Sequence, residues 1–558
     1  MTFSDTTPTR RSLIASALLA AAAGPVLAAA GPASAATGRT VRTASGVVRG
    51  TPGNDASITA FKGIPYAAAP VGDLRWKPPA PPVPWTGVRD ADAFGASPPQ
   101  AQAADGGLTM SEDCLFLNVW TGASHGPRRR PVFVWIYGGG FSGGTSSDPL
   151  FDGENLARKG VVVVTFNYRL GALGFLSTPE LSAESPHGVS GNYGLLDQVT
   201  ALKWVRRNIA AFGGDPDNVT IAGQSAGAGS VGFLSMSPLA KGLFRRSIAE
   251  SQVRDPGDPE LRYLGVSYRR IATAEEQGSA YASSHGARTL KELRALRWQD
   301  LNDAAALPDT SVDTGSVAEP PLFRPVVDGW VIPSGYRTTL ARGAQNDVDF
   351  LAGNNLDESG AVPETAFDYW RETGYPDRPG APPVHVTLDD YVSAARRKFG
   401  AMAEEFLRLY PANTDDEAAR ASNDAVRDNA RSSTYLWSTR WTRHTDRPVH
   451  TYFWTHRPPG PDHDIRGAYH ASEIAYVFAN PTTYWTNEDH KIADVMSSYW
   501  ANYAATGDPN GPGLPTWPAY NATSLTVMEL GDRFGPIAVA SPGRLGFWKR
   551  FFATQEAW

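Results

Sequence analysis

Continuous apolar runs alternate with a helix-forming stretch in the first half of the sequence. The runs occupy residues 131–137, 160–166 and 219–222, and each is rich in β-branched or aromatic residues. Such runs predict central strands that are covered on both faces. Between the last two runs, residues 195–205 carry apolar side chains at helical spacing, and Phe-Gly-Gly-Asp-Pro at 212–216 ends that helix. This alternation predicts an α/β fold with a mostly parallel, doubly wound central sheet.

Shorter extended segments come before this alternation. Residues 46–50 and 58–67 read as strands on either side of a Pro-Gly-Asn-Asp turn at 52–55. They predict an N-terminal β-meander.

The third apolar run leads into a G-x-S-x-G motif, Gly223-Gln224-Ser225-Ala226-Gly227. The small residues that follow predict a helix start, so the motif has the strand, sharp turn and helix that a nucleophile elbow requires. Glycines lack a Cβ and let strand and helix approach each other, while Ser225 is held strained at the tip. The helix N-terminus favours negative charge beside it. We predict that Ser225 is a nucleophile.

The same motif occurs twice more, without that context. Ser124 is followed by Pro127 and three arginines at 128–130, which predict a hairpin turn. Ser142 lies in a glycine-rich loop that runs into Ser-Ser-Asp-Pro at 146–149. Neither serine has a helix after it, so Ser225 is the favoured candidate.

Three consecutive glycines, Gly138, Gly139 and Gly140, follow the first apolar run. Their unshielded N–H groups can converge on one oxygen atom. The loop is either a flexible turn or an oxyanion hole, and its position after a core strand and ahead of the nucleophile favours the oxyanion hole.

Composition and charge narrow the function further. The chain has 558 residues, is 42% hydrophobic and carries a net charge of −6, so nothing indicates a nucleic-acid partner. The glycine loops lack the Lys-Ser/Thr of a P-loop, and no metal or organic cofactor is predicted. The one cysteine, Cys114, cannot form an internal disulfide, so stability must come from a large core.

The N-terminus predicts export. Arg10 and Arg11 precede an apolar, Ala-rich run, and Ala33-Ser34-Ala35 supplies an A-x-A cleavage site. Paired arginines in this position indicate a twin-arginine signal. Residues 1–35 are therefore expected to be removed, leaving 36–558 as a single secreted catalytic domain without stable membrane insertion. The alternative, a membrane anchor, is disfavoured because Gly24-Pro25 interrupts the apolar run.

A series of motifs then carries a family resemblance over most of the mature chain. The chain resembles the type-B carboxylesterases/lipases, the cholinesterase-like branch of the α/β-hydrolases. The resembling stretches are Phe61–Tyr66 (FKGIPY), Glu112–Val119 (EDCLFLNV), Trp135–Phe141 (WIYGGGF), Asn167–Gly171 (NYRLG), Gly223–Ala228 (GQSAGA), Phe323–Gly329 (FRPVVDG) and Ala505–Gly511 (ATGDPNG). The resemblance implies an α/β-hydrolase fold with helical insertions.

The resemblance also implies the remaining site residues. The family's acid follows a G-x-N-x-D-E-like stretch, here at Glu358, and its base lies in a G-x-x-H stretch, here at His470. The chain order Ser, Glu, His is that of α/β-hydrolases. The neighbouring Asp357 is expected to be a loop hydrogen-bonder. Gly139, Gly140 and Ala226 match the family's oxyanion donors.

Three departures from the family pattern stand out. The family often pairs the cysteine of its E-D-C-L motif with an earlier one, which this chain lacks, so Cys114 is expected to be a small buried hydrophobe. Gln224 stands where many members have Glu, at a variable position. Ser251 and Arg254 lie in a segment that borders the family's acyl pocket and is unusually polar here. Arg254 either pairs with Asp255 or Asp258, or points to solvent, or faces the pocket and favours acids with a polar or anionic group.

The expected activity is hydrolysis of small-molecule carboxylic esters through an acyl-enzyme intermediate. A lipase, an aromatic-acid esterase or an acyltransferase would use the same triad. A non-catalytic, adhesion-like relative is the alternative from another class, although such relatives generally lack the nucleophile. The acyl group, the alcohol and the oligomeric state stay open.

Overall fold

A computed structural model of the chain describes residues 39–101, 107–122, 129–262, 267–312, 319–373 and 387–557. The predicted signal peptide and the motif around Ser124 lie outside these residues.

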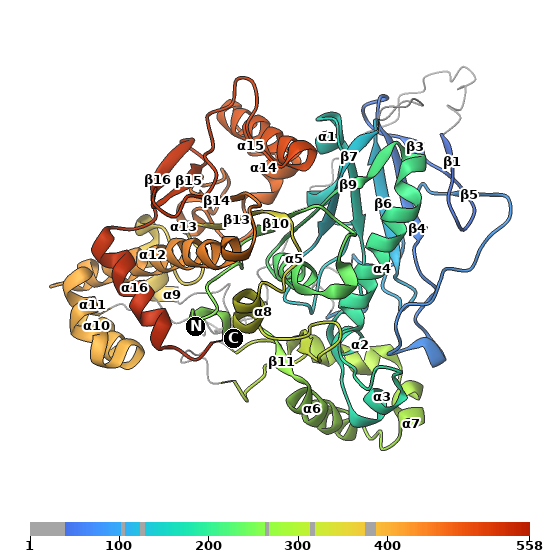
Figure 1. The fold of residues 1–558 in the computed structure, drawn as a ribbon, viewed down its shortest axis with the longest axis horizontal. Coiled ribbons are helices and arrows are strands. Elements are labelled where there is room, and N and C mark those ends of the chain that lie inside the picture. The colour runs from blue at the N-terminus through green and yellow to red at the C-terminus, as the bar shows by residue number, and fades with distance from the viewer. Residues whose placement is uncertain are drawn as a thin grey trace, which may run out of the picture.

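An eleven-stranded sheet runs through the middle of the molecule in the order β16-β15-β14-β13-β10-β9-β7-β8-β6-β4-β3 (Figure 1). From β8 to β15 all neighbouring strands are parallel, and the outer pairs are antiparallel. This mostly parallel sheet with its helices confirms the predicted fold class. Its strands are β3 (Thr51–Pro52), β4 (Thr59–Pro65), β6 (Phe116–Thr121), β7 (Arg130–Ile136), β8 (Val162–Phe166), β9 (Gly214–Gln224), β10 (Arg246–Glu250), β13 (Asp349–Asn355), β14 (Val449–Trp454), β15 (Thr526–Leu530) and β16 (Gly535–Ala538).

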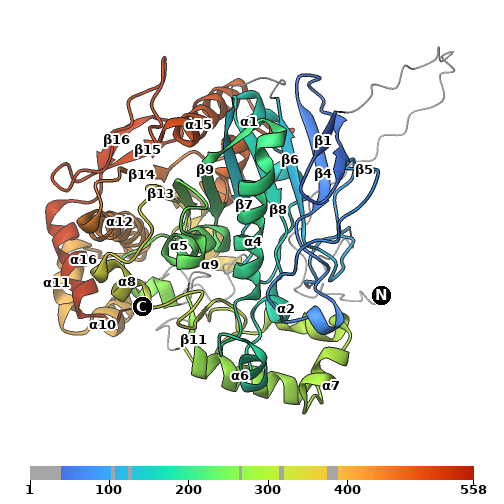
Figure 2. The ribbon, with the colours of Figure 1, turned by 45° about the vertical axis from the view of Figure 1, so that its right-hand side comes forward.

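The central strands are buried because helices pack against them. Helices α4 and α5 lie along β7 and β9 in Figures 1 and 2, and α15 also contacts both strands. Phe133 and Trp135 of β7 pack on Phe478 of α14, with ring centroids 6.0 and 5.1 Å apart. Since these side chains are 0% exposed, the apolar runs read from the sequence form the core.

Long helical insertions follow the strands that carry the site. Helices α6, α7 and α8 lie between β10 and β13, and α9, α10, α11 and α12 lie between β13 and β14. Helices α10, α11, α12 and α16 gather beside the C-terminal strands (Figure 1). The helices are α1 (Glu154–Arg158), α2 (Gly171–Phe175), α3 (Pro179–Glu184), α4 (Tyr193–Asn208), α5 (Ala226–Met236), α6 (Ile271–Ser284), α7 (Leu290–Ala295), α8 (Tyr336–Arg342), α9 (Phe367–Thr373), α10 (Leu388–Phe399), α11 (Ala403–Leu409), α12 (Asp415–Trp441), α13 (His463–Arg466), α14 (Ile474–Phe478), α15 (Asn487–Thr506) and α16 (Pro542–Thr554).

The predicted N-terminal meander is divided between two sheets. Strands β1 (Thr40–Arg42), β2 (Val47–Arg49) and β5 (Val88–Asp90) form a small sheet, in which β5 joins β2 in parallel. Strands β3, β4 and β6 instead extend the central sheet. The chain changes sheets at Gly50, where an added Cβ would lie 2.7 Å from the carbonyl oxygen of Ala60. Elsewhere, β11 (Arg269–Arg270) pairs with β12 (Val326–Val327).

Cys114 is a free thiol with 0% exposure, packed in the main core as the sequence predicted. Within the described ranges, no helix is both long and apolar enough to cross a membrane.

Candidate active site

Ser225 lies at the turn between β9 and α5, as the motif predicted. Its backbone has φ 57° and ψ −125°, a conformation that non-glycine residues rarely adopt. The Ser225 N–H donates to the carbonyl of Glu250 at 3.0 Å, and its own carbonyl accepts from Gly229 at 2.9 Å. These bonds hold the strained residue, whose side chain is half-buried.

The two glycines of the motif are required by close backbone approach. A Cβ on Gly227 would lie 2.0 Å from the carbonyl oxygen of Ile136, and one on Gly223 would lie 2.6 Å from the same atom. The elbow therefore packs directly on the end of β7, the strand that leads into the glycine loop.

The glycine loop lies beside the nucleophile. A Cβ on Gly138 would lie 2.9 Å from that of Ser225. Gly139 and Gly140 have φ values of 101° and 63°, and Gln100 fastens the loop through two hydrogen bonds to Gly144. Within the described part of the chain, the N–H groups of Gly139 and Gly140 donate to no other group. They are available to an oxyanion.

Glu358 and His470 meet from two different strands. Glu358 follows β13 and is 3% exposed, whereas the His470 side chain, which follows β14, is 38% exposed. Glu358 Oε2 lies 2.7 Å from His470 Nδ1, and Glu358 Oε1 accepts from the Asn355 N–H at 2.8 Å. This arrangement leaves His470 Nε2 as the ring nitrogen that can act on another group.

The neighbouring acid, Asp357, has another role. It pairs with Arg427 at 2.7 Å and accepts the Ala468 N–H at 2.9 Å. Asp357 thus stabilises the loop that carries His470, which is the role expected of it from the sequence.

Sequence reasoning gave Gln224 no role, yet its amide nitrogen lies 3.2 Å from His470 Nε2. The position next to a nucleophile, on the last residue of β9, is the one signal that could have suggested this contact.

The surroundings of Glu358 favour its ionised form. Burial would raise the pKa of this carboxyl, but the hydrogen bond and charge of His470, the Asn355 N–H and the charge of Arg254 together lower it. An ionised Glu358 can hold the His470 ring in one tautomer.

A buried acid pair that sequence reasoning missed lies behind these residues. Glu250 and Glu473 are both 0% exposed, and they accept from Trp500 at 2.7 Å and from the Asn355 amide at 2.5 Å. Burial, and then the charge of the partner acid, raises the pKa of Glu250. Burial raises the pKa of Glu473 to about 7, with the charge of Glu358 acting in the same direction.

Because of this buried acid pair, we expect the stability of the folded protein to fall as pH rises from mildly acidic to neutral. Between the ordinary glutamate pKa of 4.5 and about 7, the native protein keeps a proton that the unfolded chain releases. The free energy of unfolding therefore decreases over this window. Glu250→Gln should raise the melting temperature more at pH 8 than at pH 5, relative to the parent. The exposed Glu276→Gln serves as the control, and an equal shift at both pH values would contradict the prediction.

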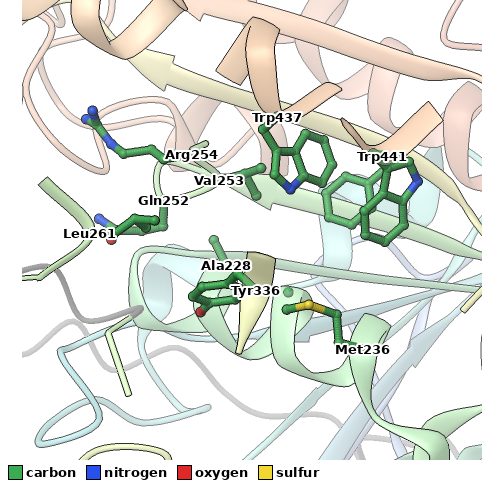
Figure 3. A pocket seen from close by; sticks show the side chains of 12 residues that line it. Ala228, Met236, Gln252, Val253, Arg254, Leu261, Tyr336, Trp437 and Trp441 are labelled. Carbon is green, nitrogen blue, oxygen red and sulfur yellow. The ribbon is translucent and has the colours of Figure 1, made fainter. Parts of the chain in front are cut away.

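The structure places Ser251 and Arg254 just after β10. Ser251 is 1% exposed and has φ 56°. Arg254 pairs with Asp258 at 3.1 Å and donates to Ser359 Oγ at 2.9 Å, so one of the acids suggested by the sequence is its partner. Arg254 also lines a cavity of about 30 Å³ beside α5 (Figure 3). Recognition of an anionic acyl group by Arg254 stays a prediction.

Comparison with known proteins identifies the family to which this chain belongs. Residues 37–542 match the Carboxylesterase family. The chain belongs to the carboxylesterase family. Fumonisin B1 esterase of Sphingopyxis macrogoltabida is 37% identical over 513 residues, which cover 88% of this chain and 86% of the relative. Para-nitrobenzyl esterase of Bacillus subtilis (strain 168) is 34% identical over 528 residues, with 88% and 94% covered.

Solved structures of similar carboxylesterases share the fold. A PNB esterase superposes with a TM-score of 0.73 at 31% identity, covering 92% of this chain and 100% of that one. A second, a thermophilic PNB esterase, gives 0.72 at 30% identity, with the same coverage. These relatives confirm the predicted resemblance, the α/β-hydrolase fold and the class of enzyme, a carboxylic ester hydrolase.

Proposed function

We propose that the protein hydrolyses small carboxylic esters through the triad Ser225, His470 and Glu358. The observation that carries the proposal is the strained Ser225 turn together with the 2.7 Å contact between Glu358 and His470. A base oriented by a buried acid, on the same sheet as an elbow serine, is the arrangement used for acyl transfer.

Each residue has a defined step in this reaction. The Ser225 hydroxyl attacks the ester carbonyl carbon while His470 Nε2 takes its proton. His470 then gives that proton to the departing alcohol, and the acyl group stays on Ser225. Water, activated by His470, releases the acid and restores the serine. Glu358 stabilises the imidazolium that forms twice in each cycle.

The N–H groups of Gly139, Gly140 and Ala226 are proposed to bind the oxyanion of each tetrahedral intermediate. Gly139 and Gly140 belong to the loop beside Ser225, and Ala226 is the first residue of α5. Losing one such donor typically lowers kcat by roughly 10²- to 10³-fold.

The test combines turnover with labelling. The mature protein should hydrolyse a short-chain para-nitrophenyl ester, and kcat/KM should fall in acid because His470 must be uncharged to accept a proton. A phosphonate ester inhibitor should block turnover by transferring its phosphonyl group to Ser225 Oγ with loss of its leaving group, and the mass of that phosphonyl group should appear at Ser225. Absence of turnover over an ester panel would favour an adhesion-like relative, and a label on another serine would refute the assignment.

The relatives guide the choice of substrates and of cellular location. Two relatives are named fumonisin B1 esterase and para-nitrobenzyl esterase. The panel of test esters should therefore include fumonisin B1 and a para-nitrobenzyl ester. We further infer that residues 36–558 act as one exported domain. The family match that begins at residue 37 supports this boundary.

A further inference from the structure

An arginine of a buried ion pair connects the loop after β10 to the loop that carries the proposed catalytic acid. The side chains of Arg254 and Asp258 are 1% and 0% exposed and lie 3.1 Å apart. The other terminal nitrogen of Arg254 donates to Ser359 Oγ at 2.9 Å. Ser359 directly follows Glu358, so the guanidinium contacts the residue next to the acid.

The Arg254 loop is itself anchored from outside the triad. Thr434 of α12 donates to the Val253 carbonyl at 2.9 Å, and the Asp255 N–H donates to Ser433 Oγ at 2.9 Å. The Asp255 carboxylate, 0% exposed, pairs with Arg440 of the same helix. Helix α12 therefore sets the position from which Arg254 reaches Ser359.

Ser359 needs such support because its backbone is strained. Its φ is 57°, in the left-handed region that costs free energy for a residue with a Cβ. A strained conformation persists only where the surroundings hold it. Shifting the acid loop would move Glu358 away from His470, and small misplacements of a catalytic group cost large factors in rate.

The direction of the Arg254 side chain fits a role toward Glu358. In Figure 3 its guanidinium points away from Trp437 and Trp441, which line the same cavity. Its charge is also among the causes that favour the ionised form of Glu358. The guanidinium thus contacts the acid loop, while Arg254 is also one of the residues that line the cavity.

We propose that Arg254, held by Asp258, is a positioning residue that fixes the Glu358 loop through Ser359. The inference rests on the proposed role of Glu358, and it gives the unusually polar segment after β10 a function in catalysis.

The decisive variants are Arg254→Met, which keeps the length of the stem, and Arg254→Lys, which keeps the charge. The matched control is Arg324→Met, which removes the arginine of another buried ion pair, whose partners are the Asp309 carboxylate and the Pro321 carbonyl. All are compared by kcat and KM on a neutral para-nitrophenyl ester, by kcat/KM against pH, and by melting temperature. The other ionisable groups nearby, which all variants keep, are Asp258, Glu260, Glu358, His470, Glu250 and Glu473.

We expect Arg254→Met to lower kcat about tenfold at nearly constant KM, and Arg254→Lys to recover part of that loss. Arg254 is one of the charges that lower the pKa of Glu358, and losing it also releases the Glu358 loop, so the acid limb of the profile, which reports the coupled acid and base, should move. Arg324→Met should leave kcat and the profile unchanged. If Arg254→Met does not fold, Ser359→Ala, which keeps the ion pair, should still lower kcat.

Three results would overturn the inference. They are an unchanged kcat in a folded Arg254→Met or Ser359→Ala, a lower kcat with an unmoved acid limb, and a loss confined to dicarboxylate half-esters. The last result would instead assign Arg254 to recognition of anionic acids. Activity retained in Ser225→Ala would refute the proposed triad itself, so the two failures are distinguishable.

Discussion

Replacing Ser225 with alanine is expected to lower kcat for ester hydrolysis by about 10⁴- to 10⁶-fold, as for other triad nucleophiles. The hydroxyl is the group that becomes acylated, and no later step can occur without it. The fold should persist, because the Ser225 side chain is half-buried at a turn and the backbone bonds to Glu250 and Gly229 do not involve the hydroxyl. Initial rates on a para-nitrophenyl ester measure the loss of kcat, and the melting temperature reports whether the fold persists.

The other two motif serines provide the comparison. Ser124→Ala should retain full turnover. Ser142→Ala should keep a working nucleophile, although its rate can change because Ser142 Oγ donates to the Gly140 carbonyl at 3.2 Å. The assignment is wrong if Ser225→Ala keeps more than a few per cent of the activity or if Ser124→Ala abolishes it.

Glu358→Gln should lower kcat by roughly 10³- to 10⁴-fold while KM changes little. The glutamine keeps the shape of the acid but loses the charge that stabilises protonated His470. Its amide can also present an N–H to Nδ1 and favour the wrong tautomer. The loss should therefore appear in the acylation rate, which single-turnover measurements report.

Asp357→Asn is the matched control for that variant, one residue away. Because Asp357 pairs with Arg427 and accepts the Ala468 N–H, Asp357→Asn should lower the melting temperature. Its loss of kcat should be smaller than that of Glu358→Gln. A folded Asp357→Asn with a larger loss of kcat than Glu358→Gln would transfer the role of the acid to Asp357.

The parts of this site that local sequence determines could be predicted. The strand and the small-residue helix around Ser225 are contiguous, so the elbow follows from local pattern. The glycine loop is likewise adjacent to its strand, β7. Glu358 and His470 are 112 residues apart, and only the family resemblance connected them.

Contacts between distant segments could not be read from the sequence. Arg254 had two acids close in sequence, Asp255 and Asp258, and local spacing does not choose between them. In the structure Arg254 pairs with Asp258, whereas Asp255 pairs with Arg440, 185 residues away on α12. The acid pair of Glu250 and Glu473 was missed for the same reason, since its members come from β10 and from the turn before α14.

The position of Cys114 has a practical consequence for attaching the enzyme to other molecules. Its thiol is sealed in the core, and burial raises the pKa of that thiol well above its ordinary value. Maleimides react with exposed thiolates, so the parent protein should resist them while folded. A cysteine introduced on the surface would then be the single reactive handle. Dyes, supports or partner enzymes could be coupled at one chosen point, with the native thiol left in place.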